Sequence, residues 1–376
     1  MNRARVAIQL ISTGGMYGAE RALLELASYI KDKGWDSHVV ALEGQGATEL
    51  VGRACAQGLA AEAFVSSGRL AFLPMVKQLR RLLRRHPQAI VHSHGYKPDI
   101  LLSLLGTPWR HACLATCHTW YSETHKLRAL EALDKQVLRG FDHVVAVSGD
   151  VFEQLVDSGV SPRKISLIKN GISALIVDEG ARSSVRREFA VPTNAKVIVQ
   201  IGRLARSKRN DLLLRAVARL AQALDIYVLL VGEGEQLQSL VELVKEQKLD
   251  GRVHFCGYRE NISQILTAAD LLALTSDKEG LPIVILEAMA MKCPIVSTHV
   301  GEIPQVLTDG RDAWIVPPND INALTDAIRE ALTRPDLAKM RAANAHLEFL
   351  RQYSRTSMGA SYLEIYDRVW ARRGWL

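Results

Sequence analysis

The chain has 376 residues, of which 48% are hydrophobic and 23% are charged, and its formal net charge is +7. This length suits two globular domains, and the composition excludes disordered and fibrous proteins. No stretch approaches the ~18 apolar residues that span a bilayer, and the short apolar run after the basic N-terminus predicts a first strand rather than a signal peptide.

The net charge and the cysteines further limit the class of protein to which the chain can belong. A basic balance is typical of proteins that bind phosphorylated ligands, anionic lipid or nucleic acid. The sequence has no helix-turn-helix, zinc-finger or RNA-binding signature, so a nucleic-acid partner is not expected. The five cysteines form no C-x-x-C pair and have no paired histidines nearby, which indicates small core residues in a reducing cytoplasm and no metal site.

The first half of the sequence alternates short apolar runs with helical patterns. Strands are expected at 5–12, 39–42, 60–65, 89–92, 113–117, 143–147 and 165–171, and helices at 19–33, 47–58 and 72–86. Each apolar run is too short for a helix and is followed by a helical pattern. Residues 1–175 are therefore predicted to form a doubly wound, Rossmann-like α/β domain.

A glycine turn from Thr13 to Gly18 joins the first expected strand to the first helix. Glycines such as Gly14 and Gly15 let backbone N–H groups approach an anion. The turn resembles a dinucleotide-binding loop, so an NAD-dependent oxidoreductase that uses it is one alternative. However, G-G-x-x-G differs from G-x-G-x-x-G, and Glu43 falls later than the acidic residue that usually follows ~20 residues on.

Two further features of the first half bear on function. His92, His94 and His118 end or follow strands, at the edge where parallel sheets bind ligands. The segment Lys77–Arg85 is basic and amphipathic. Two interpretations stay open: a helix that packs on its sheet with a solvated basic side, or a surface that contacts anionic lipid.

The second half begins after an aperiodic, polar stretch at 172–194, where a linker is expected. Residues 176–355 are predicted to form a second Rossmann-like domain, whose first strand at 196–201 leads into the loop G-R-L-A-R-S-K. Arg203 and Lys208 on this loop can clamp an anion, and the spacing is not that of an ATPase P-loop. The later loop 232–235 has two glycines, but its glutamates would repel phosphate, which favours a structural role.

The stretch Thr275–Met291 places two carboxylates beside a helix start. Glu279 follows an apolar strand at 271–275, Pro282 stands where a helix begins, and Glu287 falls in its second turn. A helix start favours an anion. A ligand with hydroxyls and a phosphate, such as a sugar nucleotide, suits this combination.

Taken together, these motifs resemble those of the retaining glycosyltransferases of family four, which have the two-domain GT-B fold. The resemblance is carried by G-G-M-Y-G-A-E-R, T-C-H, I-K-N-G, G-R-L-A-R-S-K and E-G-L-P-I-V-I-L-E-A-M-A. It implies two Rossmann-like domains that face each other across a cleft, with a last helix at 356–376 that crosses back to the first domain. Leu281 and Pro282 depart from the family pattern, which usually has an aromatic residue and a glycine there.

The resemblance also implies roles for single residues. The catalytic set would be His118, Arg203, Lys208 and Glu279. Glu279 would hold sugar hydroxyls and Glu287 the nucleotide ribose. The donor-binding set would be Gly14, Gly15, Asn170, Gly202, Arg203, Lys208, Tyr258, Arg259, Glu279, Gly280, Leu281 and Glu287.

The implied activity is the transfer of a sugar, with retention, from a UDP- or GDP-linked donor. The acceptor would be a carbohydrate or a lipid-linked glycan, such as a polysaccharide or lipopolysaccharide precursor, and no metal or other cofactor is expected. The expected location is cytoplasmic, with contact to the inner face of the membrane through Lys77–Arg85. A non-catalytic sugar-nucleotide-binding protein is the second alternative; the oxidoreductase would leave the cations and carboxylates of the second half unused.

Overall fold

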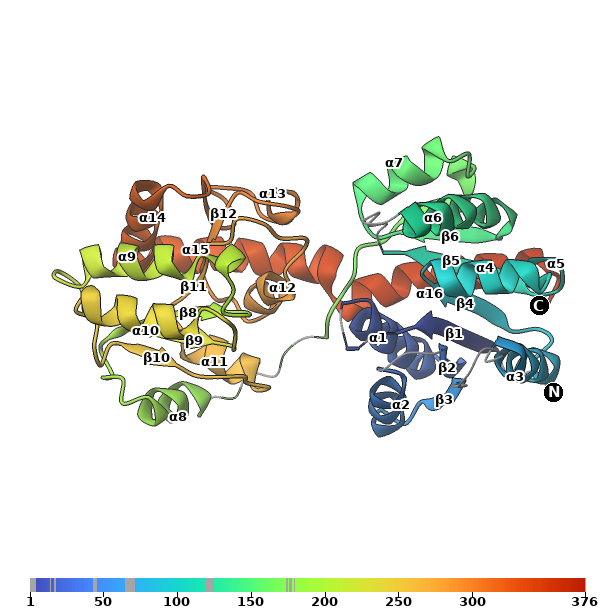
Figure 1. The fold of residues 1–376 in the computed structure, drawn as a ribbon, viewed down its shortest axis with the longest axis horizontal. Coiled ribbons are helices and arrows are strands. Elements are labelled where there is room, and N and C mark those ends of the chain that lie inside the picture. Colours follow the sequence, from blue (N-terminus) through green and yellow to red (C-terminus); the bar gives the residue numbers. More distant parts are fainter. Residues whose placement is uncertain are drawn as a thin grey trace. The chain divides into compact units, whose positions relative to one another are not determined.

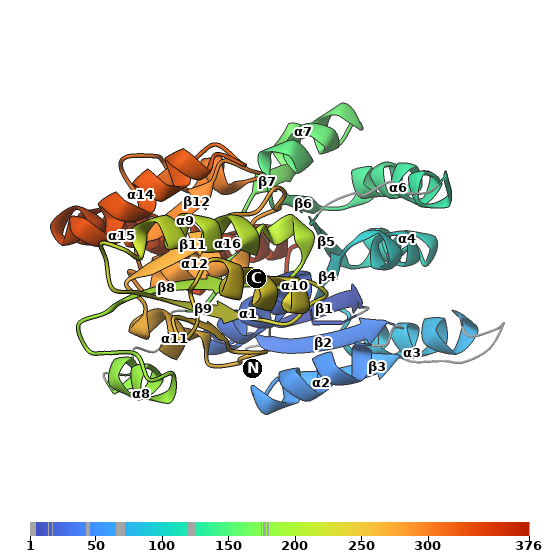
Figure 2. The same ribbon diagram turned by 60° about the vertical axis from the view of Figure 1, so that its left-hand side comes forward.

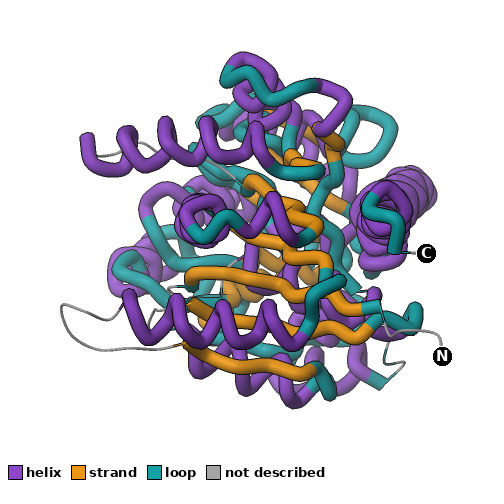
Figure 3. The backbone as a smooth tube through the Cα atoms, turned by 90° about the vertical axis from the view of Figure 1, so that its right-hand side faces the viewer, coloured by secondary structure: helices purple, strands orange, loops and turns teal. Residues whose placement is uncertain are grey.

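A computed structural model describes residues 5–375, except 14, 17, 43–45, 65–71, 119–124, 174, 176, 177 and 179. The chain divides into two compact units, one formed by Met1–Ser173 with Gln352–Leu376 and the other by Ala174–Arg351. In each unit a parallel sheet lies between helices (Figures 1 and 3). The predicted fold class, two doubly wound α/β domains, is confirmed.

The first unit contains a seven-stranded sheet in the order β3-β2-β1-β4-β5-β6-β7. All neighbouring strands run parallel. The strands are β1 (Val6–Ser12), β2 (Asp36–Leu42), β3 (Ala60–Phe64), β4 (Ile90–His94), β5 (Ala112–Cys117), β6 (His143–Ala146) and β7 (Ile165–Leu167). The strand order reverses between β1 and β4, and ligands bind at such a switch point, beyond the carboxyl ends of the strands.

Eight α-helices surround this sheet in the described part of the chain. They are α1 (Gly18–Asp32), α2 (Ala47–Ala56), α3 (Phe72–Arg85), α4 (Tyr96–Leu104), α5 (Thr107–Arg110), α6 (His125–Val137), α7 (Gly149–Asp157) and α16 (Arg355–Arg372). Strands β1, β4 and β5 are buried almost throughout, as expected for a parallel sheet covered on both faces. This explains why their sequences read as continuous apolar runs.

The last helix, α16, belongs to the first unit, as predicted. It packs against α1 and buries Tyr362, Tyr366 and Trp370 in a cluster with Trp35. Gly359 allows the close approach, because a Cβ atom there would lie 2.3 Å from ring atoms of Tyr29.

The second unit repeats the plan with a six-stranded sheet in the order β10-β9-β8-β11-β12-β13. The strands are β8 (Lys196–Ile201), β9 (Ile226–Val231), β10 (Val253–Phe255), β11 (Leu271–Leu274), β12 (Ile295–Thr298) and β13 (Trp314–Val316). The helices are α8 (Ala181–Glu188), α9 (Asn210–Leu220), α10 (Leu237–Glu246), α11 (Ile262–Ala268), α12 (Ile283–Ala290), α13 (Ile303–Val306), α14 (Ile321–Thr333) and α15 (Pro335–Glu348). The switch point of this sheet lies between β8 and β11. Figure 2 shows α9, one of the helices that cover the sheet, from the side.

Three local expectations need correction. The polar stretch expected to be a linker contains α8, which packs on α11 and is anchored by a buried arginine: Arg186 Nη2 lies 2.7 Å from Asp270 Oδ2. A helix held by a buried charge has little apolar periodicity to detect. Strand β4 reaches His94, so His92 lies inside the strand. Cys55 is exposed rather than in the core.

Candidate functional site

The switch point of the second unit is built from the loops that follow β8 and β11. Gly202 leaves β8 with a φ of +150°, a conformation that favours glycine. Gly232 and Gly234 pack against this loop: added Cβ atoms would lie 2.1 Å from the Gly202 carbonyl oxygen and 2.4 Å from that of Leu204. The glycines of loop 232–235 thus serve backbone packing, which confirms their predicted structural role.

Lys208 and Glu279, predicted to act on different parts of a ligand, contact each other. Lys208 Nζ lies 2.6 Å from Glu279 Oε1, and Ser276 Oγ donates a 2.6 Å hydrogen bond to the same oxygen. The side chain of Glu279 is 9% exposed and that of Lys208 24%. A carboxylate with this little exposure needs its cation and its hydroxyl donor, because an unpaired buried charge is costly.

Buried polar side chains fix the two loops against each other. Gln200 Nε2 donates to the carbonyl oxygen of Lys208 at 2.9 Å and to Thr275 Oγ1 at 3.0 Å. The Thr275 hydroxyl lies 2.8 Å from the carbonyl oxygen of Arg209. Lys208 and Glu279 are therefore presented by backbone that is tied on both sides, which favours a pre-organised site.

Gly301 plays a similar part on the Glu279 side. Its φ is +55°, and an added Cβ atom would lie 2.0 Å from the Glu279 carbonyl oxygen. The amide of Glu302 donates to the carbonyl oxygen of Gly280 at 3.3 Å. The loop before α13 thus supports the loop that carries Glu279 and Gly280.

The helix start and the remaining cation lie at the same carboxyl edge. Helix α12 begins at Ile283, with Pro282 at its N-cap, and no side chain caps it among the described residues. Arg203 is exposed, and its side chain forms no ion pair within the part of the chain that the structure describes. Leu281 is half-buried, and Glu287 lies in the second turn of α12, as predicted. This edge offers uncapped N–H groups and a solvent-facing guanidinium.

Tyr258 and Arg259 follow β10 at this edge, but they differ in availability. Tyr258 is 66% exposed. Arg259 pairs with Glu188, donates from Nε to the carbonyl oxygen of Cys256 at 3.1 Å, and stacks over the ring of Phe189 at 5.3 Å. Of these two residues, only Tyr258 presents most of its side chain to solvent.

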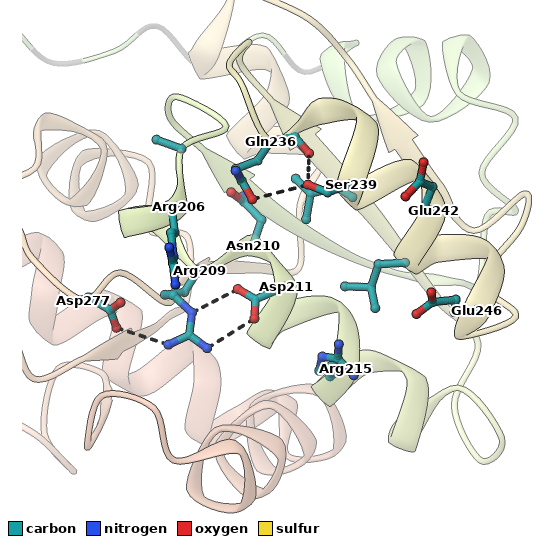
Figure 4. A pocket seen from close by; sticks show the side chains of 13 residues that line it. Arg206, Arg209, Asn210, Asp211, Arg215, Gln236, Ser239, Glu242, Glu246 and Asp277 are labelled. Carbon is teal, nitrogen blue, oxygen red and sulfur yellow. Dashed lines mark hydrogen bonds and ion pairs between the residues drawn. The ribbon is translucent and has the colours of Figure 1, made fainter.

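A pocket of about 520 Å³ lies on α9 and α10 next to the first loop (Figure 4). Arg209 spans its mouth, with bonds to Asp211 at 3.0 Å and to Asp277 at 3.4 Å. Arg209 thereby links the two loops, and its pKa is raised, chiefly by its hydrogen bond to Asp211. Lys208 and Glu279 do not line this pocket.

In the first unit, the histidines at the carboxyl edge form a buried network with α16. Tyr366 accepts a 2.8 Å hydrogen bond from Gln9 Nε2 and lies 2.7 Å from His92 Nδ1. His92 Nε2 lies 2.7 Å from Thr116 Oγ1, so the two ring nitrogens of His92 bridge the hydroxyls of Tyr366 and Thr116. Tyr362 lies 2.8 Å from the same Thr116 oxygen.

The same geometry fixes the proton of His94 and leaves ring nitrogens open. His94 Nε2 donates to Gln9 Oε1 at 2.9 Å, so His94 Nδ1 carries the lone pair. His94 Nδ1 and His118 Nε2 are buried and have no hydrogen-bond partner among the described residues. The two rings stack with centroids 5.8 Å apart.

Burial keeps these imidazoles neutral. It lowers the pKa of His92 to about 3 and that of His118 to about 4, and the pKa of His94 falls well below its usual value. Neighbouring histidines add a smaller effect for His92 and His94. His118 therefore meets a ligand as a neutral group that exchanges hydrogen bonds rather than as a cation.

The other predicted residues of the first unit are less engaged. Gly14 lies outside the described residues. The amide of Gly15 donates to Thr13 Oγ1 at 3.1 Å, so it is occupied within its own turn. Asn170 is half-buried after β7. Among the described residues no group of three potential side-chain ligands could hold a metal ion, and no helix is long and apolar enough to cross a membrane.

Sequence reasoning missed Ser276, Gln9, Tyr362 and Tyr366. Ser276 stands three residues before Glu279 in a turn, a spacing at which a hydroxyl can reach a carboxylate, so this signal was available. The others lie on β1 and α16, and their proximity to His92 and His94 depends on how the unit packs.

Two protein-family models match consecutive parts of the chain. The model described as "Glycosyltransferase Family 4" matches residues 16–174, and the model described as "Glycosyl transferases group 1" matches residues 181–347. The chain is 26% identical over 301 residues to an N-acetyl-alpha-D-glucosaminyl L-malate synthase of Bacillus anthracis, a match that covers 79% of each chain. It is 29% identical to a D-inositol 3-phosphate glycosyltransferase of Mycolicibacterium smegmatis, over 73% of this chain and 66% of that protein.

Solved structures share the fold. Anabaena HepE in complex with UDP superposes with a TM-score of 0.82 at 20% identity, over 97% of this chain and 100% of that one. A glycosyltransferase from Rickettsia africae superposes with a TM-score of 0.81 at 22% identity, over 98% and 99% of the two chains.

Proposed function

Because the chain belongs to the glycosyltransferases of family four, we propose that it transfers a sugar from a nucleoside diphosphate sugar to an acceptor hydroxyl. We further propose that transfer retains the anomeric configuration and needs no metal ion. The single observation that carries this proposal is the Lys208–Glu279 pair at the switch point of the second unit. It places a cation for a phosphate and a carboxylate for sugar hydroxyls side by side.

The charge changes of the reaction assign the cations. When the glycosidic bond breaks, negative charge grows on the β-phosphate and positive charge on the sugar. Arg203, Lys208 and the uncapped start of α12 would stabilise the phosphate, since fixed donors and cations act without reorganisation. These three groups supply the neutralisation that a divalent ion would otherwise provide.

Donor recognition would use residues around that centre. Glu279 would accept hydrogen bonds from sugar hydroxyls, and Glu287 would hold the ribose. Tyr258 is exposed enough to contact the nucleobase, whereas Arg259 would first have to leave Glu188 or act through it. The backbone of Gly202, Gly280 and Leu281 would line the phosphates.

From the first unit, His118 would contact the sugar through its open Nε2, and Gly14, Gly15 and Asn170 would complete the donor site. A neutral imidazole suits this role, because a cation there would oppose the positive charge that develops on the sugar. No residue is assigned as a covalent nucleophile. Retention would follow if the departing phosphate removes the acceptor proton on the face that it leaves.

The acceptor is proposed as a carbohydrate or a lipid-linked glycan of the cell envelope. Support comes from the names of relatives, which include a lipopolysaccharide core biosynthesis glycosyltransferase of Rhizobium meliloti, 30% identical over 60% of this chain and 64% of that protein. Solved structures of HepE contain UDP with glucose and UDP-glucose. A UDP-linked hexose is accordingly the first donor to test.

The deciding experiment incubates the purified chain with a panel of UDP- and GDP-sugars, with and without simple glycan acceptors, in buffer containing EDTA. Release of one nucleoside diphosphate, with the product anomer assigned by NMR, is the expected result. An inverted anomer would refute retention, and activity that EDTA abolishes and Mn²⁺ restores would refute the metal-free chemistry. Tight binding of a donor with no turnover on any acceptor would favour the non-catalytic alternative.

A further inference from the structure

A basic pocket lies at the amino-terminal edge of the first sheet, opposite the edge that carries His94 and His118. It has a volume of about 430 Å³ and is formed where α3 ends before β4 and where α4 and α5 lead into β5. Its lining residues are Arg80, Leu83, Arg84, Pro87, Leu105, Thr107, Arg110 and His111.

The cations of this region have no acidic partners. Arg80, Arg84 and Arg110 line the pocket, and Lys77 and Arg85 continue the exposed basic side of α3. None of these five side chains forms an ion pair within the described residues, although many other arginines of the chain do. Unpaired guanidinium groups around one pocket favour an anionic partner that can accept several hydrogen bonds.

Apolar side chains stand exposed beside these cations. Trp109, next to Arg110 on α5, is 87% exposed, and Leu104, next to Leu105, is 72% exposed. Leu73, in the first turn of α3, is 61% exposed. The apolar face of α3 itself is buried in the core through Leu79, so the helix cannot insert into a membrane by that face.

The segment that carries Trp109 is held in place by the C-terminal end of α16. Arg373 Nη2 donates to the carbonyl oxygen of Pro108 at 2.9 Å and pairs with Asp142 at 2.7 Å. His111 Nε2 lies 3.3 Å from the carbonyl oxygen of Leu83, which links α5 to α3. The exposed indole is therefore mounted on a supported element beside the cations.

We propose that this docking surface, formed by Lys77–Arg85 and residues 104–111, binds the face of an anionic membrane. The cations would contact headgroup phosphates, while Trp109 and Leu104 enter the interfacial layer, where tryptophan is favoured. Exposed leucines decide between this partner and a nucleic acid, because an aliphatic side chain gains from a lipid interface and offers little to a phosphate backbone or a stacked base. The surface lies at the opposite edge of the first sheet from His94 and His118 and does not depend on the proposed transfer chemistry.

Vesicle flotation tests the proposal with the full-length chain. The wild type should float with vesicles of equal phosphatidylglycerol and phosphatidylcholine and stay behind with phosphatidylcholine alone, and flotation should fall as salt rises. The triple variant Arg80→Gln/Arg84→Gln/Arg110→Gln should bind roughly 10²-fold more weakly, since each cation near an anionic surface contributes about fivefold. Trp109→Ala should weaken binding at constant charge.

A matched triple variant, Arg187→Gln/Lys245→Gln/Lys339→Gln, removes the same charge from exposed positions of the second unit and should bind as the wild type does. Circular dichroism of each variant establishes that it is folded. Unchanged flotation of the first triple variant, or an equal loss in the control, overturns the proposal. The proposal is also overturned if the chain binds single-stranded RNA as tightly as vesicles and Trp109→Ala leaves vesicle binding unchanged. That result would identify a nucleic-acid surface.

Discussion

In the first unit the polar groups at the carboxyl edge are buried and neutral, whereas in the second unit they are charged and lie on loops. His92 and His94 are held by Gln9 and by Tyr366, whose helix comes from the far end of the chain. Glu279 is held by Lys208 and Ser276, and the backbone carbonyl of Lys208 accepts hydrogen bonds from Gln200 and Thr275 of the same unit. Both sheets have the same strand order around the switch point.

This difference indicates a division of labour that matches the proposed reaction. A phosphate that gains charge needs fixed cations, and the second unit supplies them on pre-organised loops. A sugar that develops positive charge is disfavoured by a neighbouring cation, and burial keeps the imidazoles of the first unit neutral. Each edge can be perturbed separately, which makes the comparison testable.

The largest effect is expected at the charged edge. Glu279→Ala should lower kcat on the order of 10²–10³-fold, the size of losing one pre-organised polar contact in the transition state. Because Lys208 contacts the same carboxylate, Lys208→Met and the double variant should show strongly non-additive losses in steady-state kinetics. Additive losses would mean that the two side chains act independently and that their 2.6 Å contact has no part in turnover.

Acid should destabilise the neutral edge. The folded-state pKa values of His92 and His118, about 3 and about 4, lie below the unfolded value near 6.5. Their stabilisation is therefore complete above about pH 6.5 and is lost as pH falls toward 4, by about 1.4 kcal/mol per pH unit for each histidine. Denaturant unfolding followed by tryptophan fluorescence measures this loss of stability. The measurement uses a Trp314→Phe background, which removes the one tryptophan in the sequence of the second unit, so that the signal comes from the first unit.

A buried acid in the same unit works in the opposite direction and provides the control. Burial, and then the charge of Asp134, raises the pKa of Asp99 well above its usual value. Asp99 therefore contributes stability at low pH that is lost as pH rises through its folded-state pKa. Asp99→Asn should steepen the acid loss of the first unit; an unchanged slope would show that Asp99 does not titrate in this range.

A moderate loss of stability should follow Tyr366→Phe. The variant keeps the ring in its cluster but leaves His92 Nδ1 and Gln9 Nε2 without their shared hydroxyl, at a cost of about 1–3 kcal/mol for each buried group left unpaired. Denaturation should show the loss in the first unit only. Tyr29→Phe, a substitution at a tyrosine of the same interface whose hydroxyl takes no part in this network, should change stability less.

The smallest effect is expected at Glu287, on the nucleotide side of the charged edge. Glu287→Ala should raise the donor KM roughly tenfold and weaken binding of free nucleoside diphosphate while kcat changes little, because the ribose does not change during transfer. Titration calorimetry beside steady-state kinetics measures both. Wild-type nucleotide affinity combined with a collapse of kcat would move this glutamate into the chemistry.

The sequence predicted the charged edge better than the neutral one, for a physical reason. Strand-to-helix loops are local, so the positions of Arg203, Lys208 and Glu279 follow from short apolar runs and turn residues. The contact of Lys208 with Glu279 joins two loops across the switch point and could be expected only once the strand order was known. The predicted roles of these residues stay predictions until the kinetic measurements are made.

The neutral edge could not be assembled from local patterns. His92 and His94 can be recognised in the sequence as polar residues in an apolar strand. Their partners, however, lie on β1 and on α16, and Tyr366 is more than 250 residues later in the chain than His92. Similarly, the sequence of α8 is typical of a linker, because the helix is held by the buried Arg186 rather than by an apolar stripe. Both cases depend on tertiary packing, which sequence periodicity does not record.

The membership of α16 in the first unit has a consequence for how the chain is made. Domains tend to fold in order as they leave the ribosome, yet the first unit receives Tyr362 and Tyr366 only after the whole second unit has been translated. A nascent or truncated chain that ends near Arg351 would hold a complete second unit, while the buried His92 and Thr116 would still lack their hydroxyl partners. Completion of the histidine site thus reports that translation has reached the last helix.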